Sequence, residues 1–151
     1  MVEHPETEAK MVDVTTKEVT DRTAEAVGIV KMAAGTRSAV MARTLDKGDA
    51  LEVARIAGIM AAKRTSDLIP LCHPISIGAV SVALTEAEDG IEIRAIVRTA
   101  ERTGVEMEAL TAVAVAALTV YDMVKGIDRS ASITDVRVVR KTGGRSGDWR
   151  A

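Results

Sequence analysis

The chain has 151 residues and a mass of 16.0 kDa, a length that predicts a single domain. Hydrophobic residues make up 47% of it and charged residues 28%, which excludes wholesale disorder and collagen-like or mucin-like repeats. The net charge of −2 argues against binding to duplex DNA or to an anionic membrane surface. An anion site would therefore need a local cluster of cations.

Two kinds of residue are scarce, and each scarcity excludes a class of site. Phenylalanine is absent and there is one tyrosine and one tryptophan, so few rings could stack on single-stranded nucleic acid. The single cysteine, Cys72, excludes an intrachain disulfide and any zinc or iron–sulfur site built from several cysteines. The first ten residues do not resemble a secretory signal, and the longest uninterrupted apolar run, 112–118, is far shorter than the roughly 20 residues of a membrane span. We expect a cytoplasmic protein with no membrane partner.

The hydrophobic pattern predicts four strands and two main helices. In chain order the sequence predicts a mobile lead-in at 1–10, a strand at 26–32, a short helical or extended piece from 35 to 45, a helix at 50–65, strands at 76–85 and 90–99, a helix at 105–125, a strand at 132–139, and a Gly-rich basic tail from about 141. Asp49 is expected to cap the first main helix, and the Asp-Gly pair that ends at Gly90 predicts a hairpin.

This order of elements is typical of the ferredoxin-like βαββαβ fold of the α+β class, in which helices cover one face of an antiparallel sheet. We expect one such domain over 11–151. Its helices are apolar almost all round and one sheet face would stay bare, so more surface must be hidden than a small domain can hide. A homo-oligomer is therefore expected.

A thin polar stripe on the second main helix is the first candidate for chemistry. At 100° per residue, one side of this helix carries Glu108, Thr111, Thr119, Asp122 and Lys125. Asp122 and Lys125 are spaced i, i+3 and could form a proton-transfer pair. The residues alone leave open whether the stripe is catalytic or simply solvated.

The loop between Pro70 and Pro74 is the second candidate, because neither a helix nor a central strand can pass two prolines. His73 could carry a proton or bind an anion there, although a loop histidine more often bonds backbone. Cys72 is its sequence neighbour, so the two side chains need not face each other. We expect Cys72 to be a small packed residue rather than a nucleophile.

Cations near loops and helix ends are the third candidate, and Lys47, which precedes a glycine at a helix start, is suited to phosphate. The others are Arg22, Lys63, Arg64, Lys141 and Arg145. Neither common Gly-rich nucleotide-binding fingerprint is present. One cysteine and one histidine in the folded region cannot form a dedicated zinc site, so we expect no cofactor, and Mg²⁺ would enter only with a substrate triphosphate.

Several segments together resemble one family over Met11 to about Trp149. They are Met11–Val14, Lys47–Asp49, Ala57–Gly58, Ala61–Thr65, Asp67–Pro74, Thr103–Thr111, Val115–Met123 and Lys141–Asp148. These motifs are similar to those of the molybdenum cofactor biosynthesis protein C family, the cyclic pyranopterin monophosphate synthases.

The resemblance implies a homohexamer of ferredoxin-like subunits, a trimer of dimers. It implies a lyase that acts on a purine-nucleotide-derived substrate by general acid/base catalysis: 3′,8-cyclo-7,8-dihydroguanosine 5′-triphosphate would become cyclic pyranopterin monophosphate plus diphosphate. The catalytic positions implied are Lys47, Asp122 and Lys125. The substrate-binding positions implied are Leu71, Cys72, His73, Met107 and Glu108, with auxiliary contacts from Arg22, Lys63 and Lys141.

The main alternative is a non-catalytic ferredoxin-like oligomer that binds a ligand and regulates something else. Such a protein would need no proton-transfer residues, so alanine at Asp122 or Lys125 would leave its ligand binding intact. An RNA-recognition domain has the same strand order, but it needs aromatic residues on its central strands, which this chain lacks.

The spacing of Glu108 and Asp122 predicts something about assembly. Fourteen residues of helix span about 21 Å, too far for both side chains to touch one reacting ring. Either the substrate stretches along the helix, or two chains each contribute one end to a common pocket. We favour the shared pocket, because the apolar surface already predicts an oligomer with closed symmetry.

Overall fold

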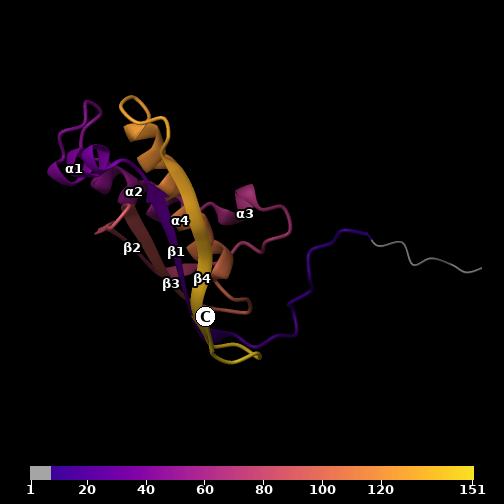
Figure 1. The fold of residues 1–151 in the computed structure, drawn as a ribbon. Coiled ribbons are helices and arrows are strands. Elements are labelled where there is room, and N and C mark those ends of the chain that lie inside the picture. The colour runs from indigo at the N-terminus through magenta and orange to yellow at the C-terminus, as the bar shows by residue number, and fades with distance from the viewer. Residues whose placement is uncertain (1–7) are drawn as a thin grey trace, which may run out of the picture.

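The computed structural model of the chain describes residues 8–151, and Figure 1 shows its fold. In chain order the elements are β1 (Thr20–Lys31), α1 (Ala34–Ala42), α2 (Ala50–Ala62), α3 (Thr65–Leu68), β2 (Ile77–Ala87), β3 (Gly90–Glu101), α4 (Glu106–Val124), β4 (Ser132–Thr142) and β5 (Trp149–Arg150). Most of the lead-in predicted at 1–10 lies outside the described residues; residues 8–10 are exposed and belong to no helix or strand.

The sheet confirms the predicted fold class. Its strand order is β2-β3-β1-β4-β5, and every neighbouring pair is antiparallel. The four long strands therefore have the order expected of a ferredoxin-like sheet. β5 is a short addition that pairs with the end of β4 through Lys141 and Trp149, and the sequence pattern did not predict it.

The boundaries of several elements differ from the prediction, most of all the start of β1. β1 begins at Thr20 rather than Ala26, because its polar first half is held by pairing with β3 on one side and β4 on the other. The helix predicted at 50–65 ends at Ala62, and a separate turn of helix, α3, follows it.

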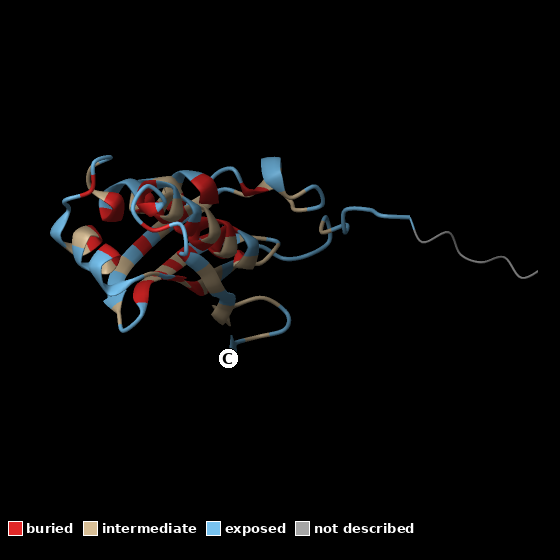
Figure 2. Ribbon diagram, turned by 45° about the horizontal axis from the view of Figure 1, so that its top comes forward, coloured by how far each residue is buried: buried red, intermediate tan, exposed pale blue. Residues whose placement is uncertain are grey.

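Helices α2 and α4 pack against each other and on one face of the sheet, and the core lies between these layers. Alternate strand residues point into it. The buried strand residues include Ala24, Ala26, Val30, Ile91, Ile93, Ala95 and Val97. Figure 2 shows buried segments on these helices and strands, with exposed residues on the loops and helix surfaces around them. The opposite face carries charge, since Glu25 there is paired with Arg94.

Glycines let α2, α4 and the sheet approach closely in a core that has no phenylalanine to fill it. A Cβ on Gly58 of α2 would lie 2.9 Å from the carbonyl oxygen of Ala112 in α4. A Cβ on Gly28 of β1 would lie 2.7 Å from Cγ1 of Val113. The core is thus filled by bringing helices and strands close together at small residues, and not by large side chains between them.

Helix α4 is the central element of this core. Within residues 8–151 it is the one helix whose length and composition would suffice to cross a membrane, yet more than half of its most apolar stretch is buried inside the fold. It contacts α2, β1, β3 and β4. Its apolar character is that expected of a core helix.

Candidate active site

The last turn of α4 brings together three residues from two distant parts of the chain. Lys47 Nζ donates hydrogen bonds to Asp122, at 2.9 Å to Oδ2 and 3.2 Å to the backbone carbonyl. Lys125 Nζ lies 2.7 Å from the other carboxylate oxygen, Oδ1. Asp122 is therefore held between two ammonium groups, one from its own helix and one from a loop 75 residues away in sequence.

The loop that carries Lys47 is closed by local interactions. Asp49 caps α2 as predicted, since its carboxylate accepts the backbone N–H of Glu52. The same carboxylate accepts Arg43 Nε at 2.8 Å, across the base of the loop. Gly48 has φ +106°, a left-handed conformation that few other residues adopt, and its N–H donates to the carbonyl of Leu45 at 3.0 Å. Lys47 thus projects from a tight turn.

The charges of this cluster determine its protonation. The ammonium groups of Lys125 and then Lys47 lower the pKa of Asp122 to about 2. In return the Asp122 carboxylate raises the pKa of Lys125. The three side chains are 51–54% exposed, and exposed ion pairs contribute little to stability. Stabilising the fold therefore does not explain the cluster, which presents a fixed carboxylate and two cations to solvent.

The first turns of α4 hold a very different carboxyl group. Glu108 is only 3% exposed, and its Oε2 has no hydrogen-bond partner among residues 8–151. Its Oε1 lies 3.8 Å from Cys72 Sγ. Burial raises the pKa of Glu108, and burial followed by the nearby Glu108 raises the pKa of Cys72. Both shifts disfavour the charged forms of the thiol and the carboxyl group.

The neighbours of this pair are more open to solvent. Leu71 and Met107, the sequence neighbours of Cys72 and Glu108, are exposed. His73 lines a shallow cavity with residues 11–15 and Arg102. The short loop between the two prolines therefore places its three predicted binding residues at the N-terminal end of α4.

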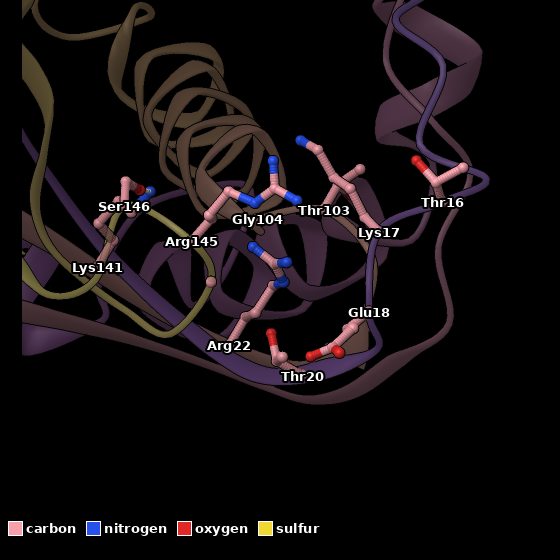
Figure 3. Close-up of a pocket in the computed structure, with 11 residues that line it drawn as sticks. Thr16, Lys17, Glu18, Thr20, Arg22, Thr103, Gly104, Lys141, Arg145 and Ser146 are labelled. Atoms are coloured by element: carbon pink, nitrogen blue, oxygen red, sulfur yellow. Dashed lines mark hydrogen bonds between the residues drawn. The ribbon is translucent and has the colours of Figure 1, made fainter.

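A cavity of about 550 Å³ lies beside the Gly-rich tail, also near the start of α4. Four cations line it, Lys17, Arg22, Lys141 and Arg145, against one carboxylate, that of Glu18. Figure 3 shows Lys17, Arg22 and Arg145 reaching into the same space. The excess of cations suits the cavity to a phosphate-bearing ligand.

Hydrogen bonds fix two of these cations in place. Arg22 Nε donates to the backbone carbonyl of Glu101 at 3.0 Å. Lys141 Nζ donates to Ser146 Oγ at 2.9 Å and lies 3.2 Å from Glu106 Oε1. Within residues 8–151, no group of three or more His, Cys, Asp or Glu side chains is arranged to hold a metal ion.

A sequence model of the MoaC family matches residues 11–144. The chain belongs to the MoaC family. Among similar proteins, the cyclic pyranopterin monophosphate synthase of Streptomyces coelicolor is 62% identical over 93% of this chain and 83% of its own length. That of Corynebacterium glutamicum strain R is 58% identical over 93% and 90%, and cyclic pyranopterin monophosphate synthase 2 of Mycobacterium tuberculosis is 57% identical over 93% and 84%.

The residues implied as functional by the MoaC resemblance fall in separate places within one chain. Lys47, Asp122 and Lys125 lie together at the C-terminal end of α4. At its other end lie the loop 71–73, Met107, Glu108, Arg22 and Lys141. Lys63 is in neither group; it lines a shallow groove between α2 and β2 with Ile59 and Ile75.

One expectation for the MoaC site needs a second chain or a long ligand. Lys47, His73 and the cations of the tail are the groups that the sequence predicts to bind phosphate or another anion. Lys47 contacts Asp122 and Lys141 contacts Glu106, two positions about 24 Å apart along α4. A single chain therefore does not bring Lys47 and Lys141 to the same phosphate group.

Sequence reasoning missed two residues around the basic cavity, Lys17 and Glu106. Lys17 lies in a segment without hydrophobic periodicity, and Glu106 resembles any acidic residue in the first turn of a helix. Their position depends on the pairing of β1 with β3 and β4, which brings Arg22, the tail and the start of α4 together. No local pattern signals that juxtaposition.

Proposed function

We propose that this chain is a cyclic pyranopterin monophosphate synthase, a lyase of molybdenum cofactor biosynthesis. It converts 3′,8-cyclo-7,8-dihydroguanosine 5′-triphosphate to cyclic pyranopterin monophosphate and diphosphate. The observation that carries the proposal is the contact of Lys47 and Lys125 with Asp122, in a chain 62% identical to a protein of that name. Lys47 and Asp122 meet only in the folded chain. The cluster suits the reaction, because ring opening and closure of the cyclic phosphate both need proton transfers.

The protonation of the cluster assigns roles to its members. Asp122 is ionised and its low pKa makes it a poor base, so it holds and orients the two ammonium groups. Lys125 is protonated and can act as a general acid. When substrate covers the cluster, loss of water disfavours the charged ammonium form, and one lysine can then accept a proton.

The other end of α4 supplies recognition. Glu108 and Cys72 offer hydrogen bonds without net charge, which suits the purine-derived ring. The cavity lined by Lys17, Arg22 and Arg145 suits the triphosphate and the diphosphate that leaves. We expect no resident cofactor, and any Mg²⁺ would arrive with the triphosphate.

We propose that the complete site is shared between subunits of a homohexamer in the cytoplasm. Glu108 and Asp122 are about 21 Å apart along α4, so one chain cannot place both against one ring. Val53, Ile56 and Met60 follow one another at helical spacing on α2, and all are exposed. This apolar stripe favours contact with another subunit.

The activity is tested by incubating purified protein with the cyclised nucleotide and following substrate, product and diphosphate by mass spectrometry. We expect consumption of the triphosphate with equal release of cyclic monophosphate and diphosphate. Binding of the nucleotide without either product would reject the synthase and favour a ligand-binding regulator.

The shared site is tested by mixing two inactive variants, Glu108→Ala and Asp122→Ala, under conditions in which subunits exchange. If the residues come from different chains, a hybrid dimer has one intact and one doubly altered site. Random pairing should then restore about a quarter of the wild-type activity. No recovery, with exchange shown by mass labelling, means that each site takes both residues from one chain.

A further inference from the structure

Contacts at the two ends of helix α1 link the segment that follows α4 to the loop that carries Lys47. The hydrophobic core holds α1 itself only weakly. It has nine residues, and only Thr36 and Val40 among them are buried. Its N-cap residue, Ala33, provides no side-chain cap. Apolar packing therefore cannot by itself fix where α1 begins and ends, and polar contacts must do so.

The N-terminal end of α1 is held by Asp128, which lies four residues beyond the end of α4. Asp128 Oδ2 accepts the backbone N–H of Ala33 at 2.9 Å and the hydroxyl of Thr36 at 3.1 Å. Oδ1 accepts Ser130 N at 3.0 Å and Ser130 Oγ at 2.6 Å. The side chain is thus saturated with hydrogen bonds, and the residue is only 8% exposed.

Asp128 is also bonded to the C-terminal end of α4, where Asp122 and Lys125 lie. Its own backbone N–H donates to the carbonyl of Val124 at 2.9 Å, so it continues the last turn of the helix. Asp128 is three residues beyond Lys125. Hydrogen bonds from Ser130 and from the Ala33 backbone hold the pKa of Asp128 at about 2, so the carboxylate keeps its charge at any working pH.

The C-terminal end of α1 is held by the loop that carries Lys47. Arg43, the C-cap residue, adopts a left-handed conformation with φ +58°. Its backbone N–H bonds the carbonyl of Val40, while its side chain bonds Asp49 across the base of the loop. Lys47 then reaches Asp122 and completes a closed circuit of contacts from α4 through α1 and back to α4.

We propose that α1 is a brace and that Asp128 is a positioning residue, which acts through α1 to hold Lys47 against Asp122. This inference rests on the proposed function for its catalytic consequence. Asp128 touches neither lysine, and its effect passes through Ala33 and Thr36 to α1 and on to Arg43 and Asp49. Arg37 anchors α1 on a different side, by pairing with Glu86 of the β2–β3 hairpin, and that contact does not lead to the catalytic cluster.

Two conservative variants test the brace. Thr36→Val keeps the shape of the side chain and removes one hydrogen bond to Asp128; Asp128→Asn replaces two acceptor oxygens by one. Displacing a reacting group by about 1 Å can cost about 10²-fold in rate. We expect kcat to fall by up to about 10²-fold in Asp128→Asn and by less in Thr36→Val, with little change in KM.

A destabilised variant elsewhere separates positioning from general loss of stability. Val97→Ala opens a cavity in the buried part of β3, far from these contacts, and should lower the unfolding midpoint while leaving kcat near wild type. The decisive comparison repeats the brace variants on a Lys47→Ala background. Because the brace acts through Lys47, their effect on kcat should vanish there. An unchanged effect on that background, or a kcat loss matched by Val97→Ala, would overturn the proposal.

A measurement that does not depend on catalysis tests the brace separately from the proposed activity. An amine-acylating reagent should label Lys47 several-fold faster in Asp128→Asn than in wild type, because the contacts with Asp122 are loosened. Lys31, which pairs with Asp89 in the turn of the β2–β3 hairpin, serves as the reference lysine in the same mass spectrum. Equal labelling of Lys47 in the two proteins would overturn the brace even if the wild type proved to be a synthase.

Discussion

The two ends of α4 place carboxyl groups on one polar stripe in opposite surroundings. Asp122 is about half exposed and carries an ammonium group on each carboxylate oxygen. Glu108 is buried, and one of its oxygens has no hydrogen-bond partner within residues 8–151. The pKa of Asp122 is lowered to about 2, whereas burial raises that of Glu108.

The difference shows that one helix can present two kinds of chemistry. The exposed end holds an ionised carboxylate between two cations, and burial at the other end disfavours the charged form of Glu108. Neither property depends on the residue type alone, because both groups are carboxyl groups. Exposure to solvent and neighbouring charges make the two carboxyl groups differ. A substitution can change either group without changing the other.

The largest effect is expected at the exposed end. Asp122→Ala and Lys125→Ala should each lower turnover by about 10²-fold or more, the scale of general acid–base groups, while the fold persists. Steady-state kinetics with the cyclised nucleotide measures this. Asp89→Ala is the matched control, since it removes an exposed ion pair with Lys31 away from the cluster. Near-wild-type turnover in both variants would mean that Asp122 and Lys125 take no part in catalysis.

A smaller effect, of several-fold, is expected in the salt dependence of substrate affinity. Lys47 is already paired with Asp122, whereas Arg145 lies among four cations that face a single lining carboxylate. Raising the ionic strength should weaken binding of the wild type, and Arg145→Ala should flatten that dependence more than Lys47→Ala does. Titration calorimetry at several salt concentrations measures it. The reverse order would place the triphosphate at the other end of α4.

At the buried end we expect a pH-dependent change in stability. The pKa of Glu108 is raised in the folded chain from its ordinary value of 4.5. Its contribution to folding is therefore complete below that value and is lost as pH rises through the raised pKa. Glu108→Gln, which cannot ionise, should become progressively more stable relative to wild type as pH rises from the ordinary pKa of Glu108 through its raised value in the folded chain. Urea unfolding at each pH measures the difference in stability, and a difference that does not change with pH would contradict a raised pKa for Glu108.

The smallest expected signal is optical. Trp149 is the only tryptophan, is 49% exposed and pairs with Lys141, which lines the basic cavity. Diphosphate that binds Lys141 should change the emission of Trp149 by a modest amount. Sodium chloride at equal ionic strength is the control. An identical response to both salts would mean that the tail does not sense the ligand.

The sequence predicted the parts of the fold and site that depend on local pattern. Alternation and helical spacing located the main strands, the long helix and the Asp49 cap, because burial on one face leaves a periodic trace. The family resemblance implied both Lys47 and Asp122 as catalytic positions. The fold then brings the two side chains into contact. Long-range contact explains what was missed: β5 is two residues long, Lys17 lies outside any periodic segment, and Glu106 meets Lys141 only once β4 has joined the sheet.

The closed circuit through α1 restricts how this segment can vary in length. Ala33 and Arg43 are both anchored to other parts of the chain, so the helix between them acts as a ruler. One inserted residue would lengthen it by about 1.5 Å and rotate its far end by about 100°. Relatives of this chain should therefore keep the number of residues between α1's two anchors unchanged.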